Sequence, residues 1–489
     1  MESPTSAAAV ASLPPPHVVL LASPGVGHLM PLAELARRLV AHHGFAATLV
    51  TFATDTSAPA ARSAVLSSLP AAGVATVTVP AAPGDDLSAD AVKAGDFLEP
   101  IRRAIPNLRA LLHSISSTAQ LAAVVPDFFC FDALPLAAEL GVPAYVFYPT
   151  NLAALAILRC AVELNDGAAA AGEYRDLPDP LLLSRHVSLR RADFPAALKD
   201  SGDPAFAGIL DLGRRYRAAA GFLVNTFHEI ESTDADEIKQ VAEQGTFPPA
   251  YPVGPLVRPS SGDEAGGAAC LDWLDRQPAR SVVYVSFGSA GLLSVEQTAE
   301  LAAGLEATGH RFLWVVRMPG LDGDHVAMAT NGSKGKEDPL AWLPEGFLER
   351  TSGRGLAVAA WAPQVRVLSH PATAAFVSHC GWNSAQESVT AGVPIVAWPL
   401  YAEQRMNAVM LSENAGVALR LRAQEVDGLI AREEIAAAVR ELMDGEEGRA
   451  VRRRAGELQR AATRAAAPEG SSWRALEDVA GMWRASLGK

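Results

Sequence analysis

Short apolar runs alternate with longer stretches of helical periodicity along the whole chain. The first run, residues 17–22, has no polar alternation and is typical of a strand buried on both faces. In residues 32–40 the apolar side chains recur at helical spacing while Arg37 and Arg38 fall on the opposite side, which predicts a helix that begins near Pro31. A strand, a helix and a further strand form the βαβ unit of a parallel sheet.

This alternation runs to about residue 225 and starts again at residue 282. Further strands of the first series are predicted at residues 49–52, 74–79, 122–125, 144–148 and 222–225. The second series predicts strands at residues 282–287, 311–316, 356–360, 375–378, 394–397 and 417–421. Ser294 is the expected cap of a helix over residues 294–309. Two similar βαβ series predict an α/β protein with two Rossmann-like, doubly wound parallel sheets.

Length and composition indicate how the chain divides into domains. A chain of 489 residues exceeds what one hydrophobic core usually supports, and 49% hydrophobic with 19% charged residues indicates globular packing. A stretch rich in proline, serine and glycine follows residue 254 and is interpreted as a linker. The predicted parts are an N-terminal domain over residues 1–254, a linker over 255–267, a C-terminal domain over 268–467 and a last helical segment over 468–489.

Charge and cysteine usage exclude several classes of partner. A net charge of −13 argues against nucleic acid or an anionic membrane surface, because both need a clustered basic face. The four cysteines show no metal-binding spacing, which fits reduced thiols. The start of the chain lacks a basic region and a signal-like apolar run, and no stretch of about 18 apolar residues occurs. We therefore expect a cytoplasmic monomer without membrane insertion.

The stretch from Trp361 to Gln404 carries most of the chemistry. A short apolar strand ends in the turn of residues 378–384, SHCGWNS, where a helix begins. The first N–H groups of a helix lack intrahelical partners and its dipole is positive there, so a phosphate can bind without a metal. Gly381 allows close approach of the backbone, and Asn383 and Ser384 add hydrogen-bonding side chains.

Other side chains of this stretch suit the remaining parts of a nucleotide sugar. Trp361 offers a flat face on which a base can stack, and Glu387 can accept hydrogen bonds from ribose hydroxyls. The pair Glu403 and Gln404 supplies acceptors and donors for the adjacent hydroxyls of a sugar. Ser289, at the exit of an earlier strand, offers another hydroxyl towards the diphosphate, and Ser23 is a weaker choice for that role.

His28 is the predicted general base. An imidazole can take the proton of a hydroxyl that attacks, and a carboxylate on its other nitrogen fixes the tautomer. Asp127 and Asp132 compete for that partner role; Asp127 directly follows a strand, whereas Asp132 opens a helix and is interpreted as a cap. In a doubly wound sheet ligands bind at the carboxyl ends of strands, where His28 and Asp127 both fall.

The sequence motifs of several other enzyme classes are incomplete or absent. A dinucleotide fingerprint starts in the glycine-rich loop before His28, but Met30 occupies the third glycine position. The P-loop, HExxH and GxSxG motifs are absent. The DxD patterns at residues 234–236 and 322–324 lie in polar segments and are interpreted as solvated charge, so no metal is predicted. Residues 318–338 are interpreted as a mobile loop near the acceptor entrance.

The stretch from WAPQ at residue 361 to Gln404 resembles the signature box of plant UDP-dependent glycosyltransferases that modify small secondary metabolites. Residues 24–28 resemble the catalytic loop of that family, with Asp127 as the carboxylate beside its base. The resemblance implies that the UDP-sugar is bound by Ser289, Trp361, Ala362, Gln364, His379, Gly381, Trp382, Asn383, Ser384, Glu387, Glu403 and Gln404. Within this set, Trp361 would stack on uracil, and Gln364 and Glu387 would hold uridine. The diphosphate would be bound by His379, Asn383 and Ser384, while Trp382, Glu403 and Gln404 would face the sugar. The box departs from the family at Ala385 and Gln386, which face no ligand there.

The resemblance also implies a fold and a reaction. It implies the GT-B fold, in which two Rossmann-like domains face a cleft, with the last helix crossing back onto the first domain. His28, supported by Asp127, would deprotonate a phenol that attacks the sugar, giving an inverted β-glucoside without a cofactor or metal ion. The closing glutamine favours UDP-glucose as co-substrate, and residues 25–39, 339–351 and 401–435 look like the branch that glucosylates hydroquinone-type phenols, monolignols and chlorinated phenols or anilines.

Two other functions and the acceptor stay open at this point. A UDP-sugar epimerase or hydrolase on the same fold would turn over the donor with no acceptor present. A nucleotide-sugar binding protein without activity is disfavoured by the pairing of His28 with Asp127. Four aromatic side chains suggest an aromatic acceptor without identifying it or its O-, N- or C-linkage: Phe128, Phe129, Phe147 and Tyr148.

Overall fold

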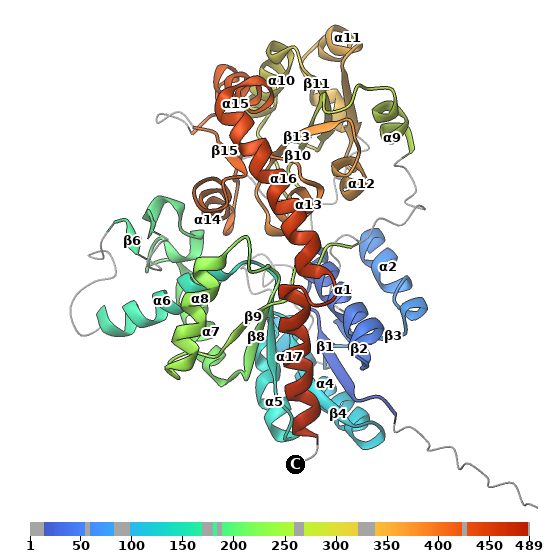
Figure 1. Ribbon diagram of the computed structural model, residues 1–489, viewed down its shortest axis with the longest axis vertical. Coiled ribbons are helices and arrows are strands. Elements are labelled where there is room, and N and C mark those ends of the chain that lie inside the picture. The colour runs from blue at the N-terminus through green and yellow to red at the C-terminus, as the bar shows by residue number, and fades with distance from the viewer. Residues whose placement is uncertain are drawn as a thin grey trace, which may run out of the picture.

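The computed structural model describes residues 14–53, 59–82, 98–168, 179–182, 188–258, 268–320, 338–422 and 428–487. Figure 1 shows two halves, one above the other, each with a sheet flanked by helices. A long helix near the C-terminus runs from the upper half to the lower one, and the last helix lies along the lower half (Figure 1).

The first half contains one parallel sheet in two segments. One segment has the order β3-β2-β1-β4, with β1 (His17–Leu21), β2 (Ala46–Phe52), β3 (Val74–Val79) and β4 (Leu121–Pro126). The other has the order β5-β8-β9, with β5 (Tyr145–Tyr148), β8 (Gly221–Val224) and β9 (Ala250–Pro252). Single bridges pair Val124 with Ala144 and Asp127 with Phe147, so β4 and β5 lie side by side. The inner strands β1, β2, β4, β5 and β8 are buried on both faces because helices cover both sides of a parallel sheet, whereas the edge strands β3 and β9 are partly exposed.

The crossovers of the first half are helical. They are α1 (Val26–His42), α2 (Pro59–Ser67), α4 (Glu99–Thr118), α5 (Leu134–Glu139), α6 (Leu152–Ala168), α7 (Pro204–Arg215) and α8 (Ser232–Glu243). A short antiparallel hairpin, β6 (Leu181–Leu182) and β7 (Ser188–Leu189), lies between α6 and α7.

The second half repeats the same winding in a six-stranded parallel sheet. Its order is β12-β11-β10-β13-β14-β15, with β10 (Val282–Ser286), β11 (Arg311–Val316), β12 (Gly355–Ala359), β13 (Thr373–Ser378), β14 (Ile395–Ala397) and β15 (Ala418–Arg420). Its helices are α9 (Ala268–Asp275), α10 (Val295–Thr308), α11 (Phe347–Thr351), α12 (Gln364–Leu368), α13 (Trp382–Ala391), α14 (Gln404–Val409), α15 (Arg432–Asp444) and α16 (Glu446–Ala466). As predicted, the side chain of Ser294 caps α10, accepting from the N–H of Gln297.

The last helix, α17 (Ser471–Ser486), packs on the first half. Its fully buried Trp483 lies in the same apolar cluster as Val18 and Leu20 of β1. The Trp483 ring meets Phe45 and Tyr145 edge-on, with centroids 5.6 Å and 5.5 Å away. Helix α17, which lies along the lower half in Figure 1, therefore completes the core of the N-terminal half.

The halves also share core residues at their boundary. Met406 and Val409 of α14 belong to the apolar cluster of the first half, and Phe227 after β8 belongs to a cluster of the second. These contacts fix the carboxyl ends of both sheets against each other. The predicted domain boundaries stay predictions, and residues 259–267 of the predicted linker lie outside the described residues.

Three details of the sequence interpretation were wrong. Helix α1 begins at Val26, five residues before the predicted start, and Pro31 lies inside it. Strand β9 was missed because its three residues lie within a proline-rich stretch. Asp234, interpreted as solvated charge, is buried on α8, while residues 322–324 and most of the 318–338 loop lie outside the described residues.

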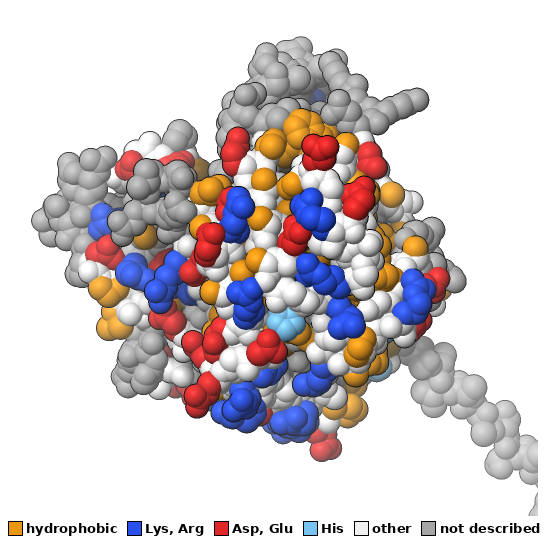
Figure 2. Space-filling model, turned by 90° about the horizontal axis from the view of Figure 1, so that it is seen from above, with side chains coloured by type: hydrophobic (Ala, Val, Ile, Leu, Met, Phe, Trp, Pro, Cys, Tyr) orange, Lys and Arg blue, Asp and Glu red, His pale blue; other side chains and the backbone are white. Residues whose placement is uncertain are grey.

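The described surface and helices add three facts. On the face in Figure 2, acidic and basic side chains are interspersed. None of the helices in the described part of the chain is both long and apolar enough to cross a bilayer. The four cysteines are all buried thiols.

Candidate active site

The site lies where four strands of the two sheets end. In each sheet the winding reverses between two central strands, β1 and β4 in the first half and β10 and β13 in the second. The connections that follow the two strands at such a reversal run to opposite faces of the sheet. A crevice therefore opens beyond the carboxyl ends of these strands. The predicted base and its carboxylate follow β1 and β4, and the predicted donor-binding turn follows β13.

His28, Asp127 and Ser23 form one hydrogen-bonded group. Nδ1 of His28 lies 2.9 Å from Oδ1 and 3.2 Å from Oδ2 of Asp127. Ser23 donates its hydroxyl hydrogen to the same Oδ1, and both Ser23 and Asp127 are buried. Because an ionised carboxylate only accepts, Nδ1 of His28 donates and Nε2 keeps its lone pair. The side chain of His28 is 26% exposed, so the basic nitrogen is within reach of a substrate.

The alternative carboxylate has a different role. Asp132 forms ion pairs with Arg215 at 2.7 Å and with Arg102 at 3.5 Å. It does not cap a helix, since Ala133 is the first residue outside α5 and makes no side-chain cap. The structure therefore assigns Asp127, and not Asp132, as the partner of His28. The hydroxyl of Ser23 likewise donates to Asp127 and does not point to the predicted place of the diphosphate.

Backbone strain is concentrated in and beside the 361–404 stretch. Ala360, Cys380 and Ala402 have positive φ values of 63°, 63° and 51°, and they are three of the five such non-glycine residues in the described chain. A positive φ is uncommon for a residue with a side chain and persists where surrounding contacts hold it. At Cys380 the holding contact is Asn407, whose Nδ2 donates to the Cys380 carbonyl at 2.9 Å; Asn151 of the first half donates in turn to Asn407 at 2.7 Å.

The residues predicted for uridine lie together. Trp361 is 48% exposed, which is unusual for a tryptophan and leaves its face accessible, while Ala362 beside it is buried. Nε2 of Gln364 donates to Oε2 of Glu387 at 2.7 Å and to the hydroxyl of Ser384 at 2.8 Å. Ser384, predicted to bind the diphosphate, is thus tied to the two side chains predicted to hold uridine.

His379 is wedged between the two turns that face the predicted diphosphate position. A Cβ added at Gly288 or Gly381 would lie 2.6 Å or 2.5 Å from Nε2 of His379, so only glycine fits at both positions. Burial and, less, the charge of Arg317 lower the pKa of His379 to about 4, so its ring is neutral near pH 7. Its buried Nδ1 has no hydrogen-bond partner among the described residues. Arg317 donates to the carbonyls of Gly288 and Ser289 and thereby shapes the turn after β10, where Ser289 is exposed.

The side chain of Trp382 does not face the sugar position, contrary to the prediction. Trp382 is 4% exposed, and its indole N–H donates to the carbonyl of Asn225 at 2.7 Å. The indole packs with Phe227 of the first half, because the first turn of α13 points its large side chain into the boundary between halves. Gln386, one helical turn further along α13, donates to the same carbonyl. Gln386 is one of the two positions at which the sequence departs from the family box, and it lies at the boundary between the halves. Only the backbone of Trp382 remains available to a ligand.

The predicted sugar end is formed by the start of α14. Oε1 of Gln404 accepts from the N–H groups of Leu400 and Tyr401 at 2.9 Å and 3.0 Å, so its oxygen is committed to the loop. The Nε2 group is then the part of Gln404 that suits a sugar hydroxyl. Glu403 is partly exposed. Burial raises the pKa of the Tyr148 phenol in the first half, and the nearby negative charge of Glu403 raises it further. Glu403 therefore faces the side on which the acceptor residues lie.

Of the aromatic residues predicted for the acceptor, Phe129 lies next to the base and Phe128 lies behind it. The Phe129 ring centroid lies 5.3 Å from that of His28 and 4.5 Å from that of Phe128. Phe147 is fully buried in the core behind the sheet and cannot line a pocket. Tyr148 is buried as well, but contacts Phe128 edge-on with centroids 5.2 Å apart.

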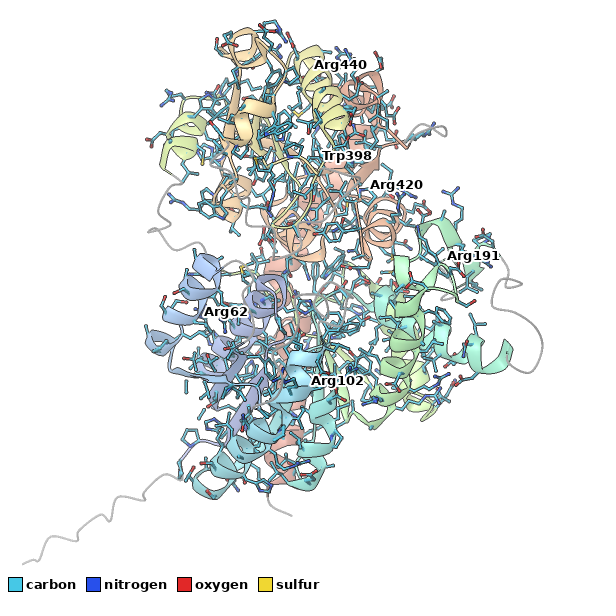
Figure 3. All side chains as sticks on the ribbon, turned by 180° about the vertical axis from the view of Figure 1, so that it is seen from behind. Arg62, Arg102, Arg191, Trp398, Arg420 and Arg440 are labelled. Carbon is cyan, nitrogen blue, oxygen red and sulfur yellow. The ribbon has the colours of Figure 1, made fainter. Side chains whose placement is uncertain are left out.

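Two polar contacts tie the halves together beside the site. Nδ2 of Asn383, in the first turn of α13, donates to the carbonyl of Gly27, next to His28, at 2.7 Å. Arg420 at the end of β15 pairs with the buried Asp193 of the first half at 2.8 Å. Figure 3 shows Arg420 on the same side of the molecule as Arg191, which belongs to the segment that carries Asp193.

Sequence reasoning missed several residues that hold the site in place. Asn225 and Asn407 were not predicted for any role, Arg317 was not singled out, and Ser23 was given another partner. Arg317 and Asn225 directly follow strands β11 and β8, which is a usable signal. Nothing in the sequence points from Asn407 to a carbonyl 27 residues away.

Comparison with known proteins agrees with this geometry. Residues 264–451 match the family described as UDP-glucoronosyl and UDP-glucosyl transferase. The chain is 45% identical over 469 residues to hydroquinone glucosyltransferase of Rauvolfia serpentina, covering 96% of this chain and 98% of that one. It is 44% identical over 475 residues to UDP-glycosyltransferase 72B1 of Arabidopsis thaliana, covering 96% of each.

A solved structure is similar over the same span. UGT2 of Phytolacca americana, complexed with UDP-2fluoro-glucose and pterostilbene, has a TM-score of 0.83 at 39% identity, covering 96% of this chain and 100% of that one. The fold is thus the GT-B fold of nucleotide-sugar-dependent glycosyltransferases, as predicted. The chain belongs to the plant UDP-glycosyltransferases.

Proposed function

We propose that the protein transfers glucose from UDP-glucose to a hydroxyl of a small phenol, with inversion at the anomeric carbon and without a metal ion. The observation that carries the proposal is the buried Asp127 against His28, beside the first turn of α13 that belongs to the donor stretch. The names of the relatives support glucose and hydroquinone as substrates.

In the proposed reaction, Nε2 of His28 takes the proton of the phenol as its oxygen attacks the anomeric carbon. The bond between that carbon and the diphosphate oxygen breaks, and UDP leaves with the electron pair. Asp127 stabilises the imidazolium that forms. The N–H groups at the start of α13, the amide of Asn383 and the neutral ring of His379 stabilise the negative charge that develops on UDP.

The acceptor position in this proposal lies against Phe129. A planar phenol can stack or lie edge-on against this ring with its hydroxyl directed to His28. The solved complex of the Phytolacca americana enzyme with pterostilbene, itself a phenol, supports a phenol as the class of acceptor. An amine of similar shape is a further acceptor class, because it too must lose a proton as it attacks.

The test is an assay of the purified protein with UDP-glucose and hydroquinone. The expected product is hydroquinone glucoside with the large anomeric proton coupling of a β-linkage in NMR, formed equally well after treatment with EDTA. An α-linked product, or loss of activity with EDTA, would contradict inversion or metal independence. UDP release without hydroquinone at the same rate would instead indicate a hydrolase.

The variant His28→Ala tests the role of the base in the same assay. It should abolish transfer yet leave the dissociation constant of UDP, measured by calorimetry, within about twofold. A large fall in UDP affinity with transfer retained would move His28 out of the base role.

A further inference from the structure

The carbonyl of Gly27 has an unusual hydrogen-bond partner. In an α-helix each carbonyl accepts from the N–H four residues on, and for Gly27 that residue is Pro31, which has no N–H. The carbonyl instead accepts from Nδ2 of Asn383, which lies 356 residues away in the other half, at 2.7 Å. Pro31 is buried inside α1, so its position in the helix is fixed by packing.

This contact joins the two parts of the proposed reaction. Gly27 is one peptide from His28, whose ring carries the base, and Asn383 lies in the first turn of α13, whose N-terminus faces the proposed diphosphate. An amide nitrogen carries two hydrogens. Asn383 can therefore donate one to Gly27 and the other to a phosphate oxygen, and so set the distance between base and donor.

We propose that Pro31 is a positioning residue of the transfer reaction, which it serves by reserving the Gly27 carbonyl for Asn383. The inference rests on the proposed function. An N–H at position 31 would compete for the carbonyl and draw it into the helix, away from Asn383. Because transfer needs reacting atoms at about 3–3.5 Å, loosening this link lowers the rate more than the binding of UDP.

The variant Pro31→Ala supplies the missing N–H and leaves the side chains of the site unchanged. The turnover number should fall about three- to tenfold, the rate equivalent of one neutral hydrogen bond, while the dissociation constant of UDP stays within about twofold. Pro106, also inside a helix, α4, is the matched control, and Pro106→Ala should leave both quantities within about twofold. Equal loss in the two variants, or none in Pro31→Ala, would overturn the proposal.

A double-mutant cycle with Asn383→Ala separates positioning from a general effect on the helix. If Pro31 acts through Asn383, Pro31→Ala lowers turnover in the native background and has no further effect in Asn383→Ala. An equal loss in both backgrounds would show a merely structural role and refute the inference. The melting temperature gives the same test without activity, since Asn383→Ala should lower it less when residue 31 is alanine. If the unaltered protein makes no glucoside, the proposed function is wrong, yet the melting cycle still decides whether Pro31 acts through Asn383.

Discussion

Replacing Asp127 by asparagine removes the charge beside His28 while it keeps the size of the side chain. Asp127 is fully buried, so water cannot take the place of the lost charge. Its Oδ1 lies 2.9 Å from Nδ1 of His28, which puts the centres of charge about 4 Å apart when the ring is protonated. At an effective dielectric constant of about 20, that pair is worth about 4 kcal/mol, or about a thousandfold in rate.

The amide also disturbs the tautomer of His28. An asparagine that donates to Nδ1 forces the ring proton onto Nε2, which removes the lone pair that takes the proton of the acceptor. We therefore expect the turnover number with UDP-glucose and hydroquinone to fall about a thousandfold, within the range of about 10²–10⁴ for a general base. UDP binding, measured by calorimetry, should not change.

The choice of acceptor makes this test specific. A phenol that is already ionised near neutral pH, such as 4-nitrophenol, needs no base. Asp127→Asn should therefore lower turnover with 4-nitrophenol much less than turnover with hydroquinone. Thermal unfolding of the variant checks that the fold is intact. Retention of turnover within about threefold, or an equal loss for both phenols, would refute the role given to Asp127 and His28.

Three further predictions follow from other parts of the structure. Trp361→Ala should weaken UDP binding by about 1–3 kcal/mol with little change in turnover, because only base stacking is lost, and unchanged affinity in calorimetry would contradict this. Burial raises the pKa of Glu231 from 4.5 to about 7, so the native state holds the proton more tightly than the unfolded chain. The free energy of unfolding should therefore fall as pH rises through this window, and denaturant titrations should show a flatter dependence for Glu231→Gln; the same slope in both would contradict the assignment. Trp483→Ala should lower the free energy of unfolding by about 3–5 kcal/mol, and a loss below about 1 kcal/mol in urea titrations would show that α17 is not part of the first core.

Much of the fold could be predicted because parallel strands have a strong sequence pattern. Residues 74–79 and 311–316 were predicted with the bounds that β3 and β11 have, and most of the other predicted strands differ from the observed ones by one or two residues at an end. The start of α1 could not be predicted, because proline is expected at the first turn of a helix and here stands five residues inside it. Pro31 is buried at this point of α1, and no local pattern contains the tertiary packing that buries it.

The site was predictable where function depends on position after a strand. His28 and Asp127 follow strands that neighbour each other in the sheet, so the winding alone brings them together. The orientation of Trp382 was not predictable, since whether an indole faces a ligand or the opposite half depends on the carbonyl of Asn225. Ser23 was assigned the wrong partner for the same reason: its hydroxyl bonds to a residue 104 positions away.

The most direct test of the central claim is a crystal structure of the protein with bound UDP. We predict uracil stacked on Trp361, ribose beside Glu387 and the diphosphate at the first turn of α13, on the side that faces His28. UDP bound away from the 361–404 stretch, or a diphosphate on the side of α13 that faces away from His28, would contradict the account.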